Sequence, residues 1–133
     1  MKALRVVVFG KSGCDKCALL NQRLDKLLEG GEWSEFEKHY CSVDTEEGLV
    51  AFSEAECINP QRIPAMLVMH RSSESAPFAP VENPNPGDYN DICKKSELYQ
   101  YIGLQTDYTA KGKGIISPRM IEHTLQKAQA AVN

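Results

Sequence analysis

Two cysteines stand close together near the start of the chain, in the segment Cys14-Asp15-Lys16-Cys17. Thiol–disulfide exchange needs one accessible thiolate to attack a substrate disulfide and a second thiol to resolve the mixed disulfide. A Cys-X-X-Cys pair supplies both, because its small disulfide loop closes and opens without unfolding the rest of a protein. We therefore predict that Cys14 is the nucleophile and Cys17 the resolving cysteine.

The pair lies where a predicted strand leads into a predicted helix. The apolar run 4–9 is typical of a buried strand, and the turn 10–13 follows it. Apolar side chains then share one helical stripe at Cys17, Leu20, Leu24, Leu27 and Leu28. A helix N-terminus stabilises a thiolate, and Lys11 and Lys16 add positive charge there, whereas Asp15 opposes it.

Metal or iron–sulfur binding through Cys14 and Cys17 is the alternative chemistry. It needs further ligands, such as Cys93 or a second copy of the pair across a dimer, and the sequence has no second Cys-X-X-Cys or paired histidine. We interpret Cys41, Cys57 and Cys93 as idle thiols. His39, His70 and His123 are scattered without metal-ligand spacing, so we predict no metal site.

Further elements are predicted to follow the first helix. Residues 39–43 suit a strand, and Asp44 suits an N-cap, with Glu47 as its capping-box partner, for a helix running to about Cys57. The next strand is the apolar run 63–69, whose proline lies near its start, where a strand tolerates it.

The second half of the chain begins with a Pro-rich loop over residues 72–95, which contains a possible short edge strand at 78–81. A helix is predicted from Ser96 to about Gln105, because Leu98 and Ile102 share a helical register. The C-terminal helix, 117–132, is predicted from an N-cap serine followed by proline at the first helical position.

The order of these features resembles the thioredoxin superfamily, and within it the glutaredoxins and small glutaredoxin-like thioredoxins. The resemblance covers about residues 4–71: a strand, Cys-X-X-Cys at a helix start, a strand and helix, then Ile63-Pro64 opening an apolar strand. It implies a three-layer α/β fold with a central mixed sheet flanked by helices, plus the Pro-rich insertion and the extra C-terminal helix. It also implies a cis bond between Ile63 and Pro64, facing the cysteines and presenting backbone groups to an extended substrate.

The resemblance implies a thiol–disulfide oxidoreductase. We predict that Ile63, Pro64, Lys11 and Lys16 contact the substrate. A Gly-Gly-X-Asp element that grips glutathione in glutaredoxins is not found, which favours a dithiol mechanism on a protein or other disulfide over glutathione binding. We expect no cofactor beyond the redox-active disulfide itself. The expected partners are a disulfide-containing protein substrate and a thiol or reductase that donates electrons. A non-catalytic binding module on the same fold is the remaining alternative.

Composition limits the other classes of function. The 133 residues suit one domain, 1–133, and the 42% hydrophobic and 25% charged content is ordinary globular usage. A net charge of −3 removes the electrostatic basis for general nucleic-acid binding. The apolar run 6–9 is far shorter than a signal-peptide core or a membrane span. We therefore expect a cytoplasmic monomer with no membrane or nucleic-acid partner.

Overall fold

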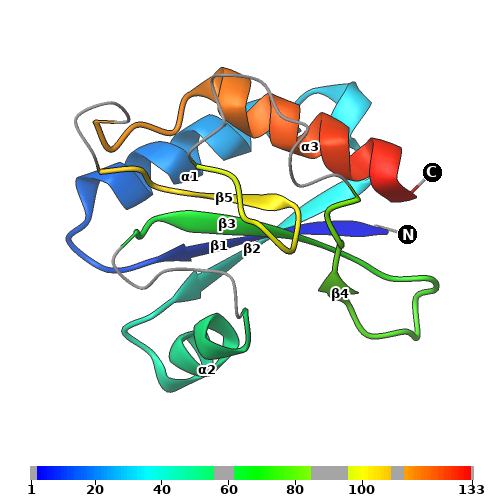
Figure 1. Ribbon diagram of the computed structural model, residues 1–133, viewed down its shortest axis with the longest axis horizontal. Coiled ribbons are helices and arrows are strands. Elements are labelled where there is room, and N and C mark those ends of the chain that lie inside the picture. Colours follow the sequence, from blue (N-terminus) through cyan, green and yellow to red (C-terminus); the bar gives the residue numbers. More distant parts are fainter. Residues whose placement is uncertain (1–2, 56–61, 85–95, 109–112, 133) are drawn as a thin grey trace.

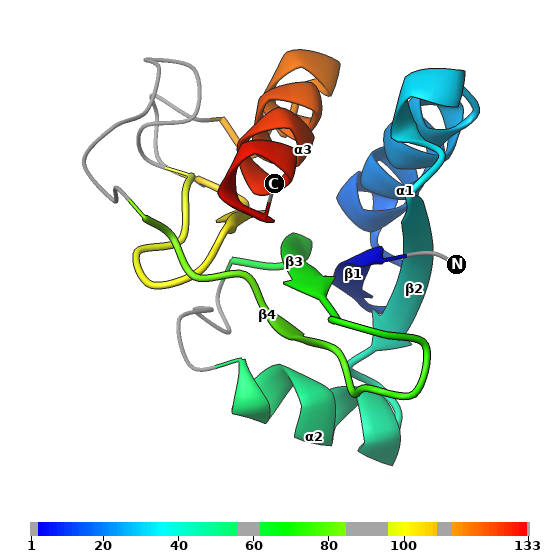
Figure 2. The ribbon, with the colours of Figure 1, turned by 90° about the vertical axis from the view of Figure 1, so that its right-hand side faces the viewer.

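The computed structural model describes residues 3–55, 62–84, 96–108 and 113–132. They form a mixed sheet in the order β2-β1-β3-β4, with β5 paired to β3 beside β4 (Figure 1). Helices α1 and α3 cover one face of this sheet and α2 lies on the other (Figure 2). The result is a three-layer α/β architecture with a central mixed sheet, as the sequence predicts.

The first three strands form the centre of the sheet. Strand β1 (Leu4–Gly10) pairs in parallel with β2 (Phe36–Ser42) and antiparallel with β3 (Ala65–His70). The β1 strand is buried along almost its whole length, which explains its unbroken apolar sequence. Because β1 and β3 run in opposite directions, the end of β1 and the start of β3 meet at the same edge of the sheet.

The helices follow from their caps and apolar stripes. Helix α1 (Asp15–Leu28) begins after Cys14, and α3 (Pro118–Val132) begins after Ser117, whose hydroxyl accepts the Met120 N–H at 3.3 Å. A short 3-10 turn, η1 (Gly31–Trp33), leads from α1 to β2. None of the helices in the described part of the chain has the length and apolar content needed to cross a membrane.

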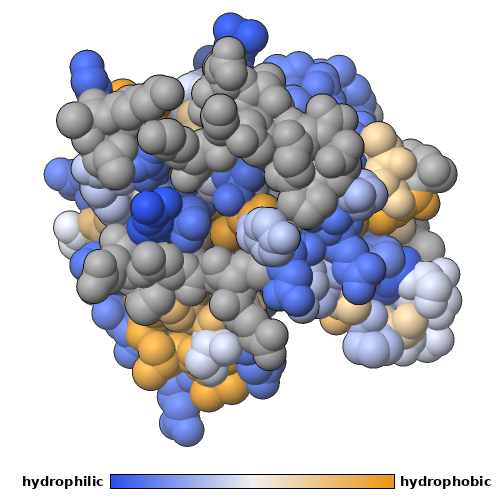
Figure 3. Space-filling model, viewed as in Figure 1, coloured by the Kyte–Doolittle hydropathy of each residue, from blue (hydrophilic) through white to orange (hydrophobic). Residues whose placement is uncertain are grey.

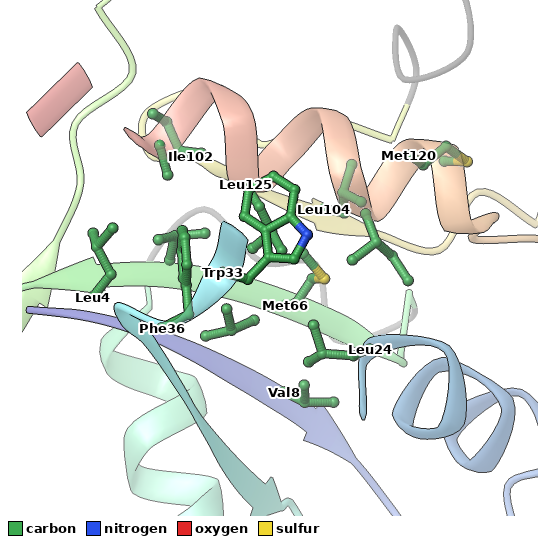
Figure 4. Close-up of a cluster of buried hydrophobic side chains, with 14 of the residues drawn as sticks. Leu4, Val8, Leu24, Trp33, Phe36, Met66, Ile102, Leu104, Met120 and Leu125 are labelled. Atoms are coloured by element: carbon green, nitrogen blue, oxygen red, sulfur yellow. The ribbon is translucent and has the colours of Figure 1, made fainter. Parts of the chain in front are cut away.

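The main core lies between the sheet and the α1–α3 layer. Figure 4 shows Trp33 and Phe36 in this core, and their rings meet edge to face at 5.9 Å. The core also contains Leu4, Val8, Leu24, Met66, Ile102, Leu104, Met120 and Leu125. A smaller cluster on the α2 face is built around Phe9 and Phe52, whose ring centroids are 5.4 Å apart.

Helix α2 (Glu46–Glu54) corrects one prediction. Its N-cap is Thr45, not Asp44, because the Thr45 hydroxyl accepts the Gly48 N–H at 3.0 Å. Asp44 is engaged elsewhere, by Ser12, so the predicted capping box with Glu47 does not form. The helix ends at Glu54; residues 56–61, and with them Cys57, lie outside the described residues.

The predicted helix from Ser96 is wrong. This segment is a hairpin, in which Glu97 bridges Leu104 and the Gln105 N–H donates to the Ser96 carbonyl at 2.8 Å. Its return strand is β5 (Gly103–Gln105). Leu98 and Ile102, taken as neighbours on one helical face, instead belong to the cores on opposite faces of the sheet.

The predicted edge strand is confirmed as β4 (Ala79–Pro80), which pairs with the end of β3. The described part of the Pro-rich segment, 72–84, therefore adds a strand to the sheet. Residues 85–95, and with them Cys93, lie outside the described residues. The strand predicted at 39–43 begins earlier, at Phe36, so that it pairs along the whole of β1.

Candidate functional site

Cys14 and Cys17 are joined by a disulfide at the N-terminus of α1. Cys14 is the N-cap residue of the helix, and its Sγ accepts the backbone N–H of Cys17 at 3.2 Å. Cys14 is half-buried, whereas Cys17 is only 2% exposed and packs into the core. The first sulfur is thus the one that solvent and substrate can reach.

The turn before the pair depends on two glycines. Gly13 has a φ of +72°, a left-handed conformation that favours glycine. Gly10 packs closely: a Cβ there would lie 2.8 Å from the Tyr40 hydroxyl and 3.2 Å from the Cys17 Cβ. These positions bring the chain out of β1 and directly into the helix that carries the cysteines.

A carboxylate fixes the same turn from outside. Asp44, which follows β2, accepts both the backbone N–H of Ser12 at 2.8 Å and its hydroxyl at 2.9 Å. These two hydrogen bonds, the backbone one foremost, hold the pKa of Asp44 below its usual range, and the Lys11 charge acts in the same direction. The turn before Cys14 is therefore tied to the loop that precedes α2.

Pro64 lies at the same edge of the sheet as the cysteines. The bond between Ile63 and Pro64 is cis, as predicted, and Pro64 is buried immediately before β3. Because Phe9 pairs with Ala65, the segment 62–64, which we call the proline loop, faces the turn that follows β1.

Two residues that the sequence analysis did not single out hold the proline loop. Thr106 is fully buried; its hydroxyl donates to the Pro64 carbonyl at 2.6 Å, and its N–H approaches the carbonyls of Arg62 and Pro64 at 3.2 Å. The Tyr108 hydroxyl donates to the Ile63 carbonyl. No motif marks either residue, because their role depends on β5 pairing with the start of β3.

The predicted basic residues are placed around the site. Lys11 and Lys16 are both exposed, Lys11 in the turn and Lys16 in the first turn of α1. The Lys16 amino group lies 6.0 Å from the centre of the Tyr108 ring. Both positive charges are thus near the Cys14 end of the helix.

Cys41 belongs to the cluster on the α2 face of the sheet, whereas α1 carries the cysteine pair on the opposite face. Cys41 is a buried free thiol on β2, and burial raises its pKa, an effect that the Arg5 charge partly offsets. Among the residues that the structure describes, no group of three His, Cys, Asp or Glu side chains is arranged to hold a metal ion.

Comparison with known proteins finds a likeness to solved structures. No known protein family matches the chain, and no curated protein matches it. The oxidised form of mitochondrial thioredoxin 3 from Saccharomyces cerevisiae is a similar solved structure, with 18% sequence identity and a TM-score of 0.42. The alignment covers 59% of this chain and 64% of that one, so the chain spans less than two thirds of the thioredoxin's length. On its own geometry, a disulfide-bonded Cys-X-X-Cys pair at the helix N-terminus of a three-layer α/β fold supports thiol–disulfide exchange.

Proposed function

We propose that the chain is a dithiol oxidoreductase that reduces protein disulfides, with Cys14 as the nucleophile and Cys17 as the resolving cysteine. The observation that carries this proposal is the disulfide between them, placed at a helix N-terminus with Cys14 more accessible than Cys17. A buried resolving thiol is protected from outside reactants, and it also lies next to the sulfur that it must attack.

The exchange takes place in two steps. The Cys14 thiolate attacks one sulfur of a substrate disulfide, forming a mixed disulfide and releasing the other substrate sulfur as a thiolate. The Cys17 thiolate then attacks the Cys14 Sγ, which releases the second substrate thiolate and re-forms the Cys14–Cys17 bond. Two electrons pass to the substrate, and an external thiol or a reductase must return them to the protein.

The surroundings of the pair supply stabilisation and substrate contact. In the reduced protein, the N-terminus of α1 and the Cys17 N–H favour negative charge on the Cys14 sulfur. Ile63 and Pro64, held by Thr106 and Tyr108, present an ordered stretch of backbone beside the cysteines. We assign substrate contact to this stretch together with Lys11 and Lys16, with no cofactor other than the disulfide and with a reducing, cytoplasmic setting.

Single cysteine replacements test the proposal. With dithiothreitol as donor and a disulfide-linked fluorescent peptide as substrate, Cys14→Ser should lower the rate to the uncatalysed value. Cys17→Ser should instead accumulate a covalent adduct, visible by mass spectrometry, because the mixed disulfide is formed but not resolved. Cys41→Ala is the matched control: it removes a cysteine that lies apart from the pair, so turnover should be retained.

Two results would contradict the assignment. Full turnover by Cys14→Ser would show that another group attacks the substrate. An adduct on Cys14→Ser, but none on Cys17→Ser, would show that the roles of the two cysteines are reversed.

A further inference from the structure

A pocket of about 250 Å³ opens beside Pro64, between α1 and the segment that leads into α3. The two walls are joined by a hydrogen bond from the Arg23 guanidinium to the Ile116 carbonyl at 2.8 Å. The lining residues are Lys16, Leu19, Leu20, Arg23, Pro64, Thr106, Gly114, Ile115 and Ile116. The pocket thus begins inside the Cys-X-X-Cys motif, at Lys16, and includes the buried proline of the proline loop.

The pocket combines apolar walls with positive charge. Leu19 and Ile115 on its walls are 43% and 49% exposed, so two large apolar side chains are accessible at the pocket. Lys16 and Arg23 contribute the only charged groups among its lining residues, and both are cations. A volume below that of a typical small-molecule site suits one or two side chains of a larger partner.

The charge of this pocket differs from that of the chain. The net charge is −3, yet none of the described residues that line the pocket carries a carboxylate. The carboxylates nearest in sequence are Asp15, which is exposed on α1, and Asp107, which is buried. Neither is a lining residue, so the charged side chains that line the pocket in the described part of the chain, Lys16 and Arg23, are both cations.

We infer that this pocket selects disulfide substrates whose reacting cysteine is flanked by an acidic side chain in a protein segment. This inference rests on the proposed function, since Cys14 must react with that cysteine while the neighbouring carboxylate meets Lys16 and Arg23. The apolar walls accept the methylene groups of the acidic side chain. Opposite charge across the contact favours both encounter and orientation of the substrate.

Three disulfide-linked peptides that carry Glu, Gln or Lys on both sides of the cysteine test the inference. Each rate of reduction by the reduced protein is divided by the rate with dithiothreitol, which removes the intrinsic effect of the flanking charge. We expect Glu to exceed Gln and Gln to exceed Lys by roughly two- to five-fold per step, the range of exposed ion pairs. The differences should shrink in high salt.

Charge reversal at the pocket provides the matched comparison. Lys16→Glu should invert the order of the three peptides, whereas Lys26→Glu, the same change in the last turn of α1, should leave the order unchanged. Equal normalised rates for the wild type, or an order that Lys16→Glu does not alter, would overturn the selectivity and leave the oxidoreductase intact.

A binding measurement separates failure of the selectivity from failure of the proposed function. If the wild type reduces none of the peptides, the oxidoreductase proposal fails. The Cys14→Ser, Cys17→Ser double variant is then titrated with the Glu and Lys peptides and followed by NMR. Shifts of the Lys113–Ile116 amide signals with the Glu peptide alone would support the pocket assignment, and their absence would overturn it.

Discussion

The two faces of the sheet are covered to different extents. Helices α1 and α3 pack on one face over a continuous core that includes Leu24 and Leu125, both fully buried. Among the described residues, α2 is the one helix on the other face, and a pocket of about 450 Å³ remains beside it, lined by Val7, Phe9 and Leu67 among others. The cysteines and the proline loop are positioned from the closely packed side. The comparison teaches that the more continuously packed layer carries the cysteine pair, while the α2 side contributes the Asp44 contacts to the turn before it.

The weaker coverage on the α2 side is also visible at the surface of the molecule (Figure 3). Apolar residues gather at the lower part of the view, where α2 lies in Figure 1. Leu49 and Val50 on α2 are 56% and 50% exposed. Helix α2 therefore leaves part of its apolar surface in solvent.

The largest expected effect compares a leucine from each helical layer. Leu24→Ala on α1 should lower the free energy of unfolding by about 2–5 kcal/mol, because it removes a fully buried side chain and leaves a cavity. Leu49→Ala on α2 should change it by no more than about 0.5 kcal/mol, since that side chain is largely exposed. Urea unfolding of both variants gives the two values. Equal losses of unfolding free energy in the two variants would show that the two helical layers contribute equally to stability.

An intermediate effect is expected at Thr106, which ties the closely packed side to the proline loop. Thr106→Val keeps the shape but removes the hydroxyl that donates to the Pro64 carbonyl, at a cost of about 1 kcal/mol in unfolding free energy. We also expect a lower kcat/KM for disulfide reduction, because the loop is less well fixed. Thr106→Ser keeps the donor and should retain most of the activity. Unchanged kcat/KM in Thr106→Val would refute the positioning role.

The smallest effect concerns Asp44, which links the turn before α1 to the loop before α2. Its folded-state pKa is lowered by Ser12, so the unfolded state binds more protons in acid and stability falls as pH falls. The stability difference between wild type and Asp44→Asn should shrink as pH drops from about 4, the unfolded value, through the lowered pKa. Urea unfolding between pH 6 and 2 measures this difference.

Ser12→Ala provides the control for that measurement. It removes the hydroxyl donor but keeps the backbone N–H that donates to Asp44, so part of the pH-dependent difference should remain. A difference between wild type and Asp44→Asn that stays constant with pH would show that the Ser12 contacts do not stabilise the ionised carboxylate.

Sequence patterns predicted the first half of the fold well because the hydrophobic periodicity of each segment agrees with the turn and cap residues on either side of it. The apolar run of β1, the stripe of α1 and the proline before β3 each have one consistent interpretation. The prediction of a helix from Ser96 was wrong because two apolar residues four positions apart, such as Leu98 and Ile102, also occur in a hairpin. Only long-range pairing with β3 decides between these two structures.

The site was predictable only in part, for the same reason. Spacing identified Cys14 and Cys17, and resemblance identified Pro64 as a cis proline. Thr106 and Tyr108 gave no local signal, because they are far from Pro64 in sequence and reach it through the β3–β5 pairing. Asp44 was found as a capping candidate, but its true partner, Ser12, is 32 positions away.

Three successive carbonyl groups of the proline loop already accept hydrogen bonds from within the protein. Thr106 donates to those of Arg62 and Pro64, and Tyr108 donates to that of Ile63. The conformational entropy of ordering this stretch is therefore lost during folding and not when a substrate arrives. A substrate strand bound there, as we propose, would meet a preorganised edge, so less of its interaction energy would be consumed in fixing the protein and more would remain as affinity.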